Sequence, residues 1–430
     1  MASETQTLES LCSLIADCPH STPVWTDSGF IVLRNQNIKK GRLDLSSPSF
    51  TDAEHFAGRN RRAKPTHGDI VITREAPMGD VCMVPEGLEC CLGQRQVLLR
   101  PNPSLINPRF LHFALQSAVV QNQIAWSEGT GSTVSNLRIP VLKALAIPTP
   151  SRAAQDLIAS TLGALDDRID LLRQTNATLE AIAQALFKSW FVDFDPVRAK
   201  AEGREPEGMD AATAALFPSE FEASELGLIP RGWRAGNLRE LCQNIRQQAK
   251  PASLDPTTPY IGLEHMPRGS IALTEAGSAS GLASGKFWYA KYDVLFGKLR
   301  PYFHKVGVAS HTGVCSTDIL VVRASEPDWF GFTAMQLSSD EIIAYATRLS
   351  NGAKMPRSSW SDIAAYKVVI PPEPVARSFD GLVRAIIERI HANIDRATNL
   401  VCLRDTLLPR LISGKLRLPE AEKSVEEAVA

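Results

Sequence analysis

Two stretches of the chain repeat apolar residues in alternating steps of four and three positions. In the first, from Ser151 to Phe191, these positions hold Ile158, Leu162, Leu165, Ile169, Leu172, Leu179, Ala183 and Leu186, with Asn176 as the polar exception. In the second they hold Phe379, Val383, Ile386, Ile390, Asn393, Ala397, Leu400 and Leu407. Such spacing is typical of a coiled-coil seam, so it predicts two long helices that pack on each other. The first helix should be about 50 Å long.

The second series lies 221 positions after the first, which indicates an internal repeat. Shorter segments before each helix recur in the same order. Residues 8–15, 33–43, 68–77, 129–137 and 144–150 resemble residues 238–245, 261–271, 292–301, 350–360 and 367–372. Five matches in one order, each set leading into a heptad helix, predict a duplicated domain.

A twofold relation between the copies predicts that the two helices run antiparallel. A single Asn in an apolar seam commonly fixes the register, because an apolar partner would leave its hydrogen bonds unmade. We therefore pair Asn176 with Asn393, which sets Leu179 against Ile390 and Trp190 against Phe379. Leu165 then faces Arg404, whose charged head we expect to reach water. The alternative places both Asn side chains at the edge of the seam, facing solvent or a partner.

Between the helices the pattern predicts short strands and helices, hence a mixed α/β (α+β) fold. Expected strands lie at 30–33, 69–73, 81–84 and 96–100, an expected helix at 108–123, and a strand ending at Pro148. The predicted domains are 1–150 and 233–375, two similar recognition domains; 151–192 and 376–413, the long helices; 193–232, a linker or ordered excursion; and 414–430, a frayed tail.

The composition limits the possible chemistry. The 430 residues carry a net charge of −1 and are 44% hydrophobic, and no apolar run is long enough for a membrane span. Eight scattered cysteines without a CxxC motif predict reduced thiols in a cytoplasmic protein. We find no phosphate-binding loop, nucleophile elbow or HExxH motif. The sequence therefore predicts a binding protein with no catalytic residues, no cofactor and no metal.

Basic residues gather in one segment of each copy. The candidate DNA contacts are Arg59, Arg61, Arg62 and Lys64 in the first copy, and Lys298, Arg300, His304 and Lys305 in the second. Cationic side chains neutralise phosphates, and arginine also reads guanine edges. For any single residue, a solvated surface is the alternative. A cluster in each copy favours DNA binding.

Three tracts resemble a known family, the DNA-specificity subunits of type I restriction–modification systems. They are LFKSWFVDFDPVRAKAEGREPEGM (186–209), LFPSEFEASELGLIPRGW (216–233) and LLPRLISGKL (407–416). The resemblance extends to the order of two variable domains and two conserved helices. It implies that each globular domain reads one half of a split DNA target and that the helices hold the domains apart.

The resemblance also implies partners. Modification subunits, expected to be two, would methylate adenine, and restriction subunits would carry the ATP-dependent motor and nuclease. Two alternatives remain open from the residues alone. The chain could be the specificity half of a split or fused methyltransferase, or a coiled-coil scaffold that binds only protein.

Overall fold

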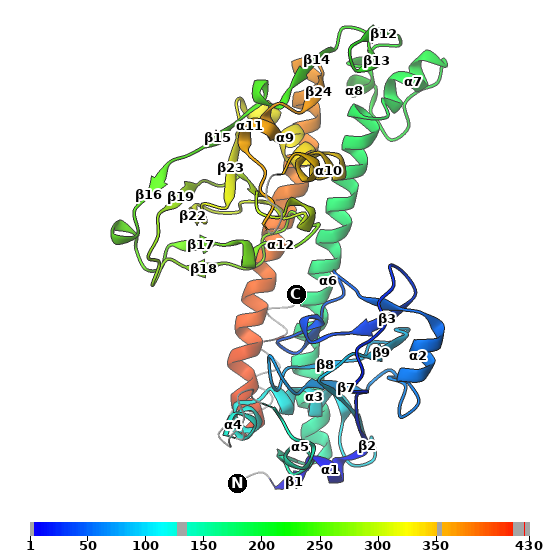
Figure 1. Ribbon diagram of the computed structural model, residues 1–430, viewed down its shortest axis with the longest axis vertical. Helices are drawn as coiled ribbons and strands as arrows, with labels where there is room; N and C mark the ends of the chain where they lie inside the picture. The colour runs from blue at the N-terminus through cyan, green and yellow to red at the C-terminus, as the bar shows by residue number, and fades with distance from the viewer. Residues whose placement is uncertain (1–3, 127–135, 351–354, 416–424, 426–430) are drawn as a thin grey trace. The chain divides into compact units, whose positions relative to one another are not determined.

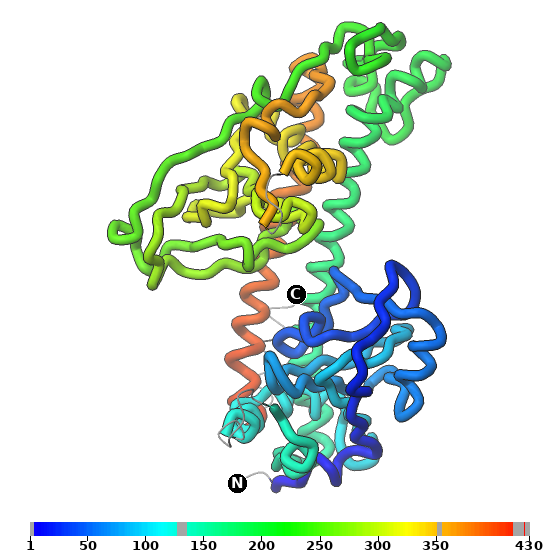
Figure 2. The backbone as a smooth tube through the Cα atoms, viewed as in Figure 1, coloured from blue at the N-terminus to red at the C-terminus, as the bar shows by residue number. Residues whose placement is uncertain are grey.

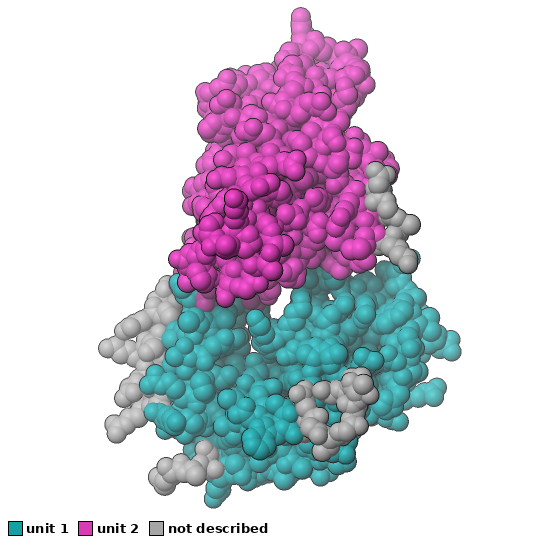
Figure 3. All heavy atoms as spheres, turned by 60° about the vertical axis from the view of Figure 1, so that its left-hand side comes forward, with its two compact units in different colours: residues 1–170, 399–430 teal, residues 171–398 magenta. Residues whose placement is uncertain are grey.

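The computed structural model describes residues 4–126, 136–350 and 355–415, together with residue 425. The chain divides into two compact units. The first contains residues 1–170 and 399–430, and the second contains residues 171–398 (Figure 3). Both units combine helices with sheets, as the sequence predicts, and the predicted tail at 414–430 lies almost entirely outside the described residues. No helix in the described part of the chain is long and apolar enough to cross a membrane.

A four-stranded antiparallel sheet forms the centre of the first unit (Figure 1). Its strand order is β2 (Cys12–Asp17), β10 (Gln96–Pro101), β7 (Ile70–Thr73) and β8 (Val81–Met83). A second sheet pairs β3 (Phe30–Leu33) in parallel with β9 (Cys90–Leu92) and antiparallel with β6 (Phe50–Thr51). The four strands expected at 30–33, 69–73, 81–84 and 96–100 all begin at or within one residue of the predicted position, and β3 matches it at both ends.

The expected helix at 108–123 is wrong as a single element. The structure has α3 (Pro108–Gln116) and α4 (Ala118–Trp126), interrupted at Ser117. The backbone of Ser117 is extended, with ψ of 148°, and its hydroxyl donates to the carbonyl of Ala114 at 2.6 Å. A serine hydroxyl that bonds to the preceding turn competes with helical hydrogen bonding, which explains the break. Remaining elements of this unit are β1 (Thr5–Thr7), α1 (Leu8–Leu11), β4 (Ile38–Lys39), β5 (Arg42–Leu43), α2 (Ala53–Arg59), α5 (Ile139–Lys143) and β11 (Ala146–Pro148).

The second unit has a central sheet of the same order. It consists of β15 (Cys242–Ile245), β23 (Ile319–Ala324), β20 (Val294–Gly297) and β21 (Val306–Val308). A second sheet again contains a parallel pair, here β17 (Pro259–Ile261) with β22 (Gly313–Cys315). It is extended by β16 (Gln248–Ala249), β18 (Gly277–Ser278) and β19 (Lys286–Tyr289), and the unit also holds β14 (Arg234–Asn237), β24 (Lys367–Ile370), α9 (Phe330–Leu337), α10 (Asp340–Leu349) and α11 (Trp360–Ala364).

Strand pairing gives the correspondence between the copies position by position. Ile72 is paired with Val97 and Val81 in the first unit, as Phe296 is with Leu320 and Val306 in the second. Each copy therefore has the same antiparallel ladder, offset by about 224 residues. The parallel strand pair, which is unusual in an otherwise antiparallel arrangement, also recurs. The topology agrees with the repeat that the sequence predicts.

The two heptad stretches form helices α6 (Arg152–Phe191) and α12 (Glu373–Ile412). The second helix begins three residues before the predicted position. In the second unit the amide of Asn393 donates to the side-chain oxygen of Asn176 at 2.8 Å, and both residues are buried. The rings of Trp190 and Phe379 lie 5.5 Å apart. These two pairs confirm the antiparallel register within this unit and exclude Asn side chains that face solvent.

The expected exposure of the Arg404 head is wrong. Within the first unit its guanidinium is buried and bonded to Asp166 at 2.8 Å and to Asp405 at 2.7 Å. An Asp one position after Leu165 supplies a buried counter-ion, so the head does not have to reach water. Coulombic attraction to both carboxylates keeps this buried cation charged against the opposing effect of desolvation.

Residues 193–232 belong to the second unit. Figure 2 shows them as a folded green segment that continues from the end of α6. They form α7 (Asp195–Ala201), α8 (Ala211–Ala215) and the hairpin of β12 (Phe221–Ser224) and β13 (Gly227–Pro230). An aromatic cluster anchors this excursion to the long helices. Trp190 lies 5.1 Å from Phe217, and Phe191 lies 4.8 Å from Phe379, measured between ring centroids. The aromatic residues of the 186–233 tract are therefore core residues.

Candidate nucleic-acid interface

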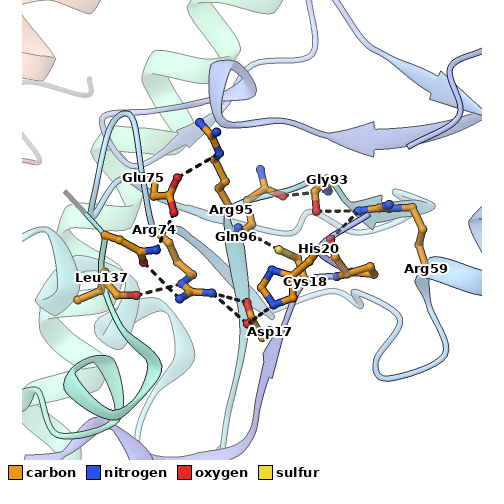
Figure 4. Close-up of polar contacts among 12 residues, drawn as sticks. Asp17, Cys18, His20, Arg59, Arg74, Glu75, Gly93, Arg95, Gln96 and Leu137 are labelled. Atoms are coloured by element: carbon orange, nitrogen blue, oxygen red, sulfur yellow. Dashed lines mark hydrogen bonds and ion pairs between the residues drawn. The ribbon is translucent and has the colours of Figure 1, made fainter. Parts of the chain in front are cut away.

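Arg59 is a structural residue rather than a surface cation. It ends α2 and is only 7% exposed. Its guanidinium donates to the carbonyl oxygens of Leu92 at 2.7 Å, Gly93 at 2.9 Å, Ser21 at 3.1 Å and Pro19 at 3.3 Å. Figure 4 shows the bond to Gly93. Four of the five donors are thus used inside the protein. We remove Arg59 from the candidate DNA contacts, because it is fixed in place by the backbone it supports.

The next three basic residues of this segment are exposed. Arg61 and Arg62 follow α2, and neither guanidinium forms an ion pair or hydrogen bond with a residue that the structure describes. Lys64 is bonded to Glu89 at 2.7 Å and lies 5.7 Å from the ring centroid of Phe56. A cation already paired with a carboxylate neutralises a phosphate less effectively. Arg61 and Arg62 are therefore the better placed candidates.

In the second unit, most of the basic segment packs against its own fold. One ring nitrogen of His304 lies 3.0 Å from the carbonyl oxygen of Ser338, and the other lies 3.4 Å from Asp340. The Lys305 amine donates to the carbonyl of Leu263. Arg300 is half-buried, with its guanidinium 5.9 Å from the ring centroid of Phe303. These three side chains have protein neighbours and are weaker candidates than the sequence alone indicates.

Lys298 has a different environment. It follows β20 and lines a depression of about 470 Å³ together with Arg246, Arg357, Phe287 and Trp360. Lys298 is half-buried, and Arg246 and Arg357 are exposed. The three cations come from segments separated by 52 and 59 residues along the chain. Their side chains meet because β15 and β20 lie on either side of β23 in the central sheet.

Sequence reasoning missed Arg246, Arg357 and the two rings. Trp360 lies in one of the repeated segments, and Arg246 comes directly after another. Only strand pairing could have revealed Arg246 and Arg357 as the counterparts of Asp17 and Asn136, because the repeated segments of the sequence set Arg246 against Ala16. Clustering along the sequence could not, because each of these residues stands apart from the others.

The corresponding part of the first unit is a closed network of charges (Figure 4). Arg74 is bonded to Asp17 at 2.9 Å, to the side chain of Asn136 at 3.2 Å and to the carbonyl of Leu137 at 3.0 Å. Glu75 accepts from Asn136 and lies 3.1 Å from Arg95. Each cation therefore has a carboxylate partner within the unit.

The described residues do not contain a catalytic arrangement of cysteines. Burial raises the pKa of Cys12, Cys90, Cys242 and Cys315 to about 12, so these thiols stay protonated near neutral pH. Exposed Cys402 is a free thiol, and no group of three potential metal ligands occurs among the residues described.

Comparison with known proteins identifies the kind of binding. Residues 23–181 match the family described as "Type I restriction modification DNA specificity domain". The type I restriction enzyme MjaIX specificity subunit of Methanocaldococcus jannaschii is 25% identical over 82% of this chain and 78% of that protein. The HindI specificity subunit of Haemophilus influenzae is 26% identical over 74% of this chain and 80% of that protein.

Residues 23–181 thus match a type I DNA specificity domain, and most of the chain is similar to type I specificity subunits. The fold agrees with that assignment. A crystal structure of the type I restriction–modification S subunit from M. genitalium has a TM-score of 0.51 with this chain, at 16% identity, and covers 95% of both chains. These matches confirm the resemblance to DNA-specificity subunits noted in the sequence.

Proposed function

We propose that the chain recognises a bipartite, asymmetric DNA sequence, with one half read by each unit. The observation that carries the proposal is the repeated sheet topology with different residues at corresponding positions. A repeated fold supplies two similar DNA-binding surfaces, and different surface residues, such as Asp17 and Arg246, favour different half-sites. The proposed boundaries of the two recognition domains remain 1–150 and 233–375.

We propose further that α6 and α12 form an antiparallel coiled coil that separates the two recognition domains about a pseudo-twofold axis. Half-sites read from one face of a duplex lie about one helical turn, roughly 34 Å, apart. A helix of 40 residues is long enough to span this distance, at about 1.5 Å per residue. The length of the helices would then determine the gap in the target.

The chemistry is proposed to reside in partner subunits in the cytoplasm. The relatives are named specificity subunits of restriction enzymes, which favours assembly with modification subunits that methylate adenine and restriction subunits that cleave DNA. The adenine would have to be flipped out of the duplex to reach a methyltransferase. Candidate DNA contacts of this chain are Arg61, Arg62, Lys64 and Lys298, with Arg300, His304 and Lys305 as weaker ones.

Mapping methylated adenines in host DNA, with and without this chain, tests the proposal. We expect methylation at a split asymmetric sequence that disappears when the gene is deleted. The full chain, assembled with its modification subunits, should also bind a duplex of that sequence more tightly than a scrambled duplex. Equal binding to both duplexes would support a protein scaffold instead.

A further inference from the structure

The depression around Lys298 is a basic concave surface of the second unit that connects residues from distant segments. None of the residues that line it is acidic. Arg357 lies 3.3 Å from Asp318, which stands outside the lining. Neither Arg246 nor Lys298 forms an ion pair or side-chain hydrogen bond with a residue that the structure describes, so both cations can take an external anion.

Strand pairing identifies the matching residues of the first unit. In the first unit, Asp17 of β2 lies opposite Val97 of β10. In the second unit, the pairing of β15 with β23, continued by one residue, places Arg246 opposite Leu320. Leu320 is the counterpart of Val97, so Arg246 corresponds to Asp17. Arg74 directly follows β7, the neighbour of β10 in the first sheet, and Lys298 directly follows β20, the neighbour of β23 in the second. Arg74 and Lys298 therefore correspond as well. The backbone N–H of Leu137 donates to the carbonyl of Arg74 at 3.0 Å, as that of Ser358 does to Lys298 at 3.0 Å. Asn136 therefore corresponds to Arg357.

The two matching surfaces carry different charges. In the first unit the residues are Asp17, Arg74, Glu75, Arg95 and Asn136, two cations and two carboxylates with a net charge of zero. In the second they are Arg246, Lys298, Leu299, Asp318 and Arg357, three cations and one carboxylate with a net charge of +2. The same fold position is thus closed and neutral in one copy and open and basic in the other.

We propose that this basic depression binds the phosphate backbone of the DNA at the half-site read by the second unit, whereas the first unit makes no such contact at the matching position. The inference rests on the proposed recognition of DNA by both units. Two or three cations converging on one concave surface can neutralise adjacent phosphates and release their counterions. The half-buried rings of Phe287 and Trp360 line the same depression.

The test transplants the charges of the first unit into the second. The double variant Arg246→Asp, Lys298→Arg installs the pair formed by Asp17 and Arg74, and it lowers the net charge by two. Arg239→Asp is the matched control, since this exposed residue of the same unit lies outside the depression and its exchange also lowers the charge by two. Binding of the full chain with its modification subunits is measured on the target duplex between 50 and 300 mM salt.

We expect the slope of log K against log salt to shrink by about two for the double variant, and affinity at 0.1 M salt to fall by roughly 30- to 100-fold. The control should change the slope by much less. An unchanged slope in the double variant, or an equal change in the control, would overturn the inference. If the double variant does not fold, the single variant Arg357→Asn tests the inference. It should reduce the slope of log K against log salt by about one, and an unchanged slope would overturn the inference.

Duplexes with one half-site scrambled separate this inference from the proposed function. Wild type should lose affinity when either half-site is scrambled. If neither scrambled duplex binds more weakly than the target, the proposed sequence recognition itself is rejected. With recognition intact, the double variant should bind all three duplexes more weakly by a similar factor and keep its sensitivity to scrambling, because a phosphate contact carries no base information. Loss of sensitivity to scrambling of one half-site in the double variant would overturn the inference, because the depression would then contact bases and not phosphates.

Discussion

Among the basic residues, burial separates structural cations from candidate DNA contacts. Arg59 and Arg61 are two positions apart, yet Arg59 donates four hydrogen bonds to backbone carbonyls while Arg61 is exposed. Burial also lowers the pKa of the Arg59 guanidinium. This cost is offset by the hydrogen bonds, since a buried charge without partners is strongly destabilising.

Changing Arg61 and Arg62 together to Ala should weaken DNA binding and reduce the slope of log K against log salt by about two, if both contact phosphate. Folding should be unaffected, because both side chains are exposed. Binding is measured with the full chain and its modification subunits. Arg59→Ala is the contrasting variant, and it should instead lower the free energy of unfolding by a few kcal/mol. A salt slope equal to that of wild type would show that Arg61 and Arg62 are solvated surface residues that do not contact phosphate.

His112 makes the stability of the first unit sensitive to acid. Burial lowers its pKa to about 4 from a usual 6.5, and the attraction of Asp166 opposes this only in part. Between these pH values the unfolded chain binds a proton that the folded chain does not. The contribution of neutral His112 to the free energy of unfolding is therefore fully present above pH 6.5 and is lost as the pH falls toward 4.

The variant His112→Gln should remove that part of the pH dependence, on the order of 3 kcal/mol between pH 7 and pH 4. Urea unfolding at several pH values measures it. Exposed His67 offers a matched control, and His67→Gln should retain the wild-type profile. A profile for His112→Gln that follows wild type at every pH would contradict a neutral buried imidazole.

For the long helices, the buried Asn pair fixes the register within the second unit. The Asn176 amide also lies 3.5 Å from the carbonyl of Ile390, so both side chains have partners in the seam. Apolar residues at neighbouring seam positions would tolerate a shift by one heptad, whereas the Asn pair would lose its hydrogen bonds.

Asn176→Leu alone should lower the free energy of unfolding by about 1–3 kcal/mol, because the amide of Asn393 is left without its partner. Replacing both by Leu should restore stability but relax the register. Disulfide formation measures the register in a Cys402→Ser background, since Cys402 is exposed. Cysteines at 179 and 390 should crosslink in both backgrounds. Cysteines at 179 and 383 should crosslink only in the double Leu variant, and their crosslinking with the Asn pair present would count against this account.

At the scale of the whole molecule, the proposed function makes the gap in the DNA target depend on helix length. Inserting one heptad into both α6 and α12 at matched positions preserves the apolar seam and should add about 10 Å between the recognition domains. We expect methylation at the same two half-sites with a gap longer by about three base pairs, mapped by long-read sequencing. A heptad inserted into only one helix should abolish binding. Methylation at the original spacing by the double insertion would exclude the helices as the spacer.

The sequence by itself determined the elements whose pattern is local. Heptad spacing located both long helices, short β-branched or leucine-rich runs located β3 and β10, and the lone Asn in each seam predicted the pairing of the helices. These inferences succeed because periodicity reports which face of an element is buried. Even here Ser117 ended a helix that the pattern continued, since its hydroxyl bonds to the preceding turn.

Tertiary structure alone decided which charged side chains are exposed and unpaired, and so able to contact DNA. Arg59 and Arg404 are exposed or buried according to neighbours distant in sequence, namely the carbonyls of Leu92 and Gly93 and the carboxylate of Asp166. The depression of the second unit likewise exists because the sheet brings together residues 246, 298 and 357. Burial and charge pairing depend on contacts between segments that no local pattern encodes, and for this reason the fold was predictable in outline while the candidate site was not.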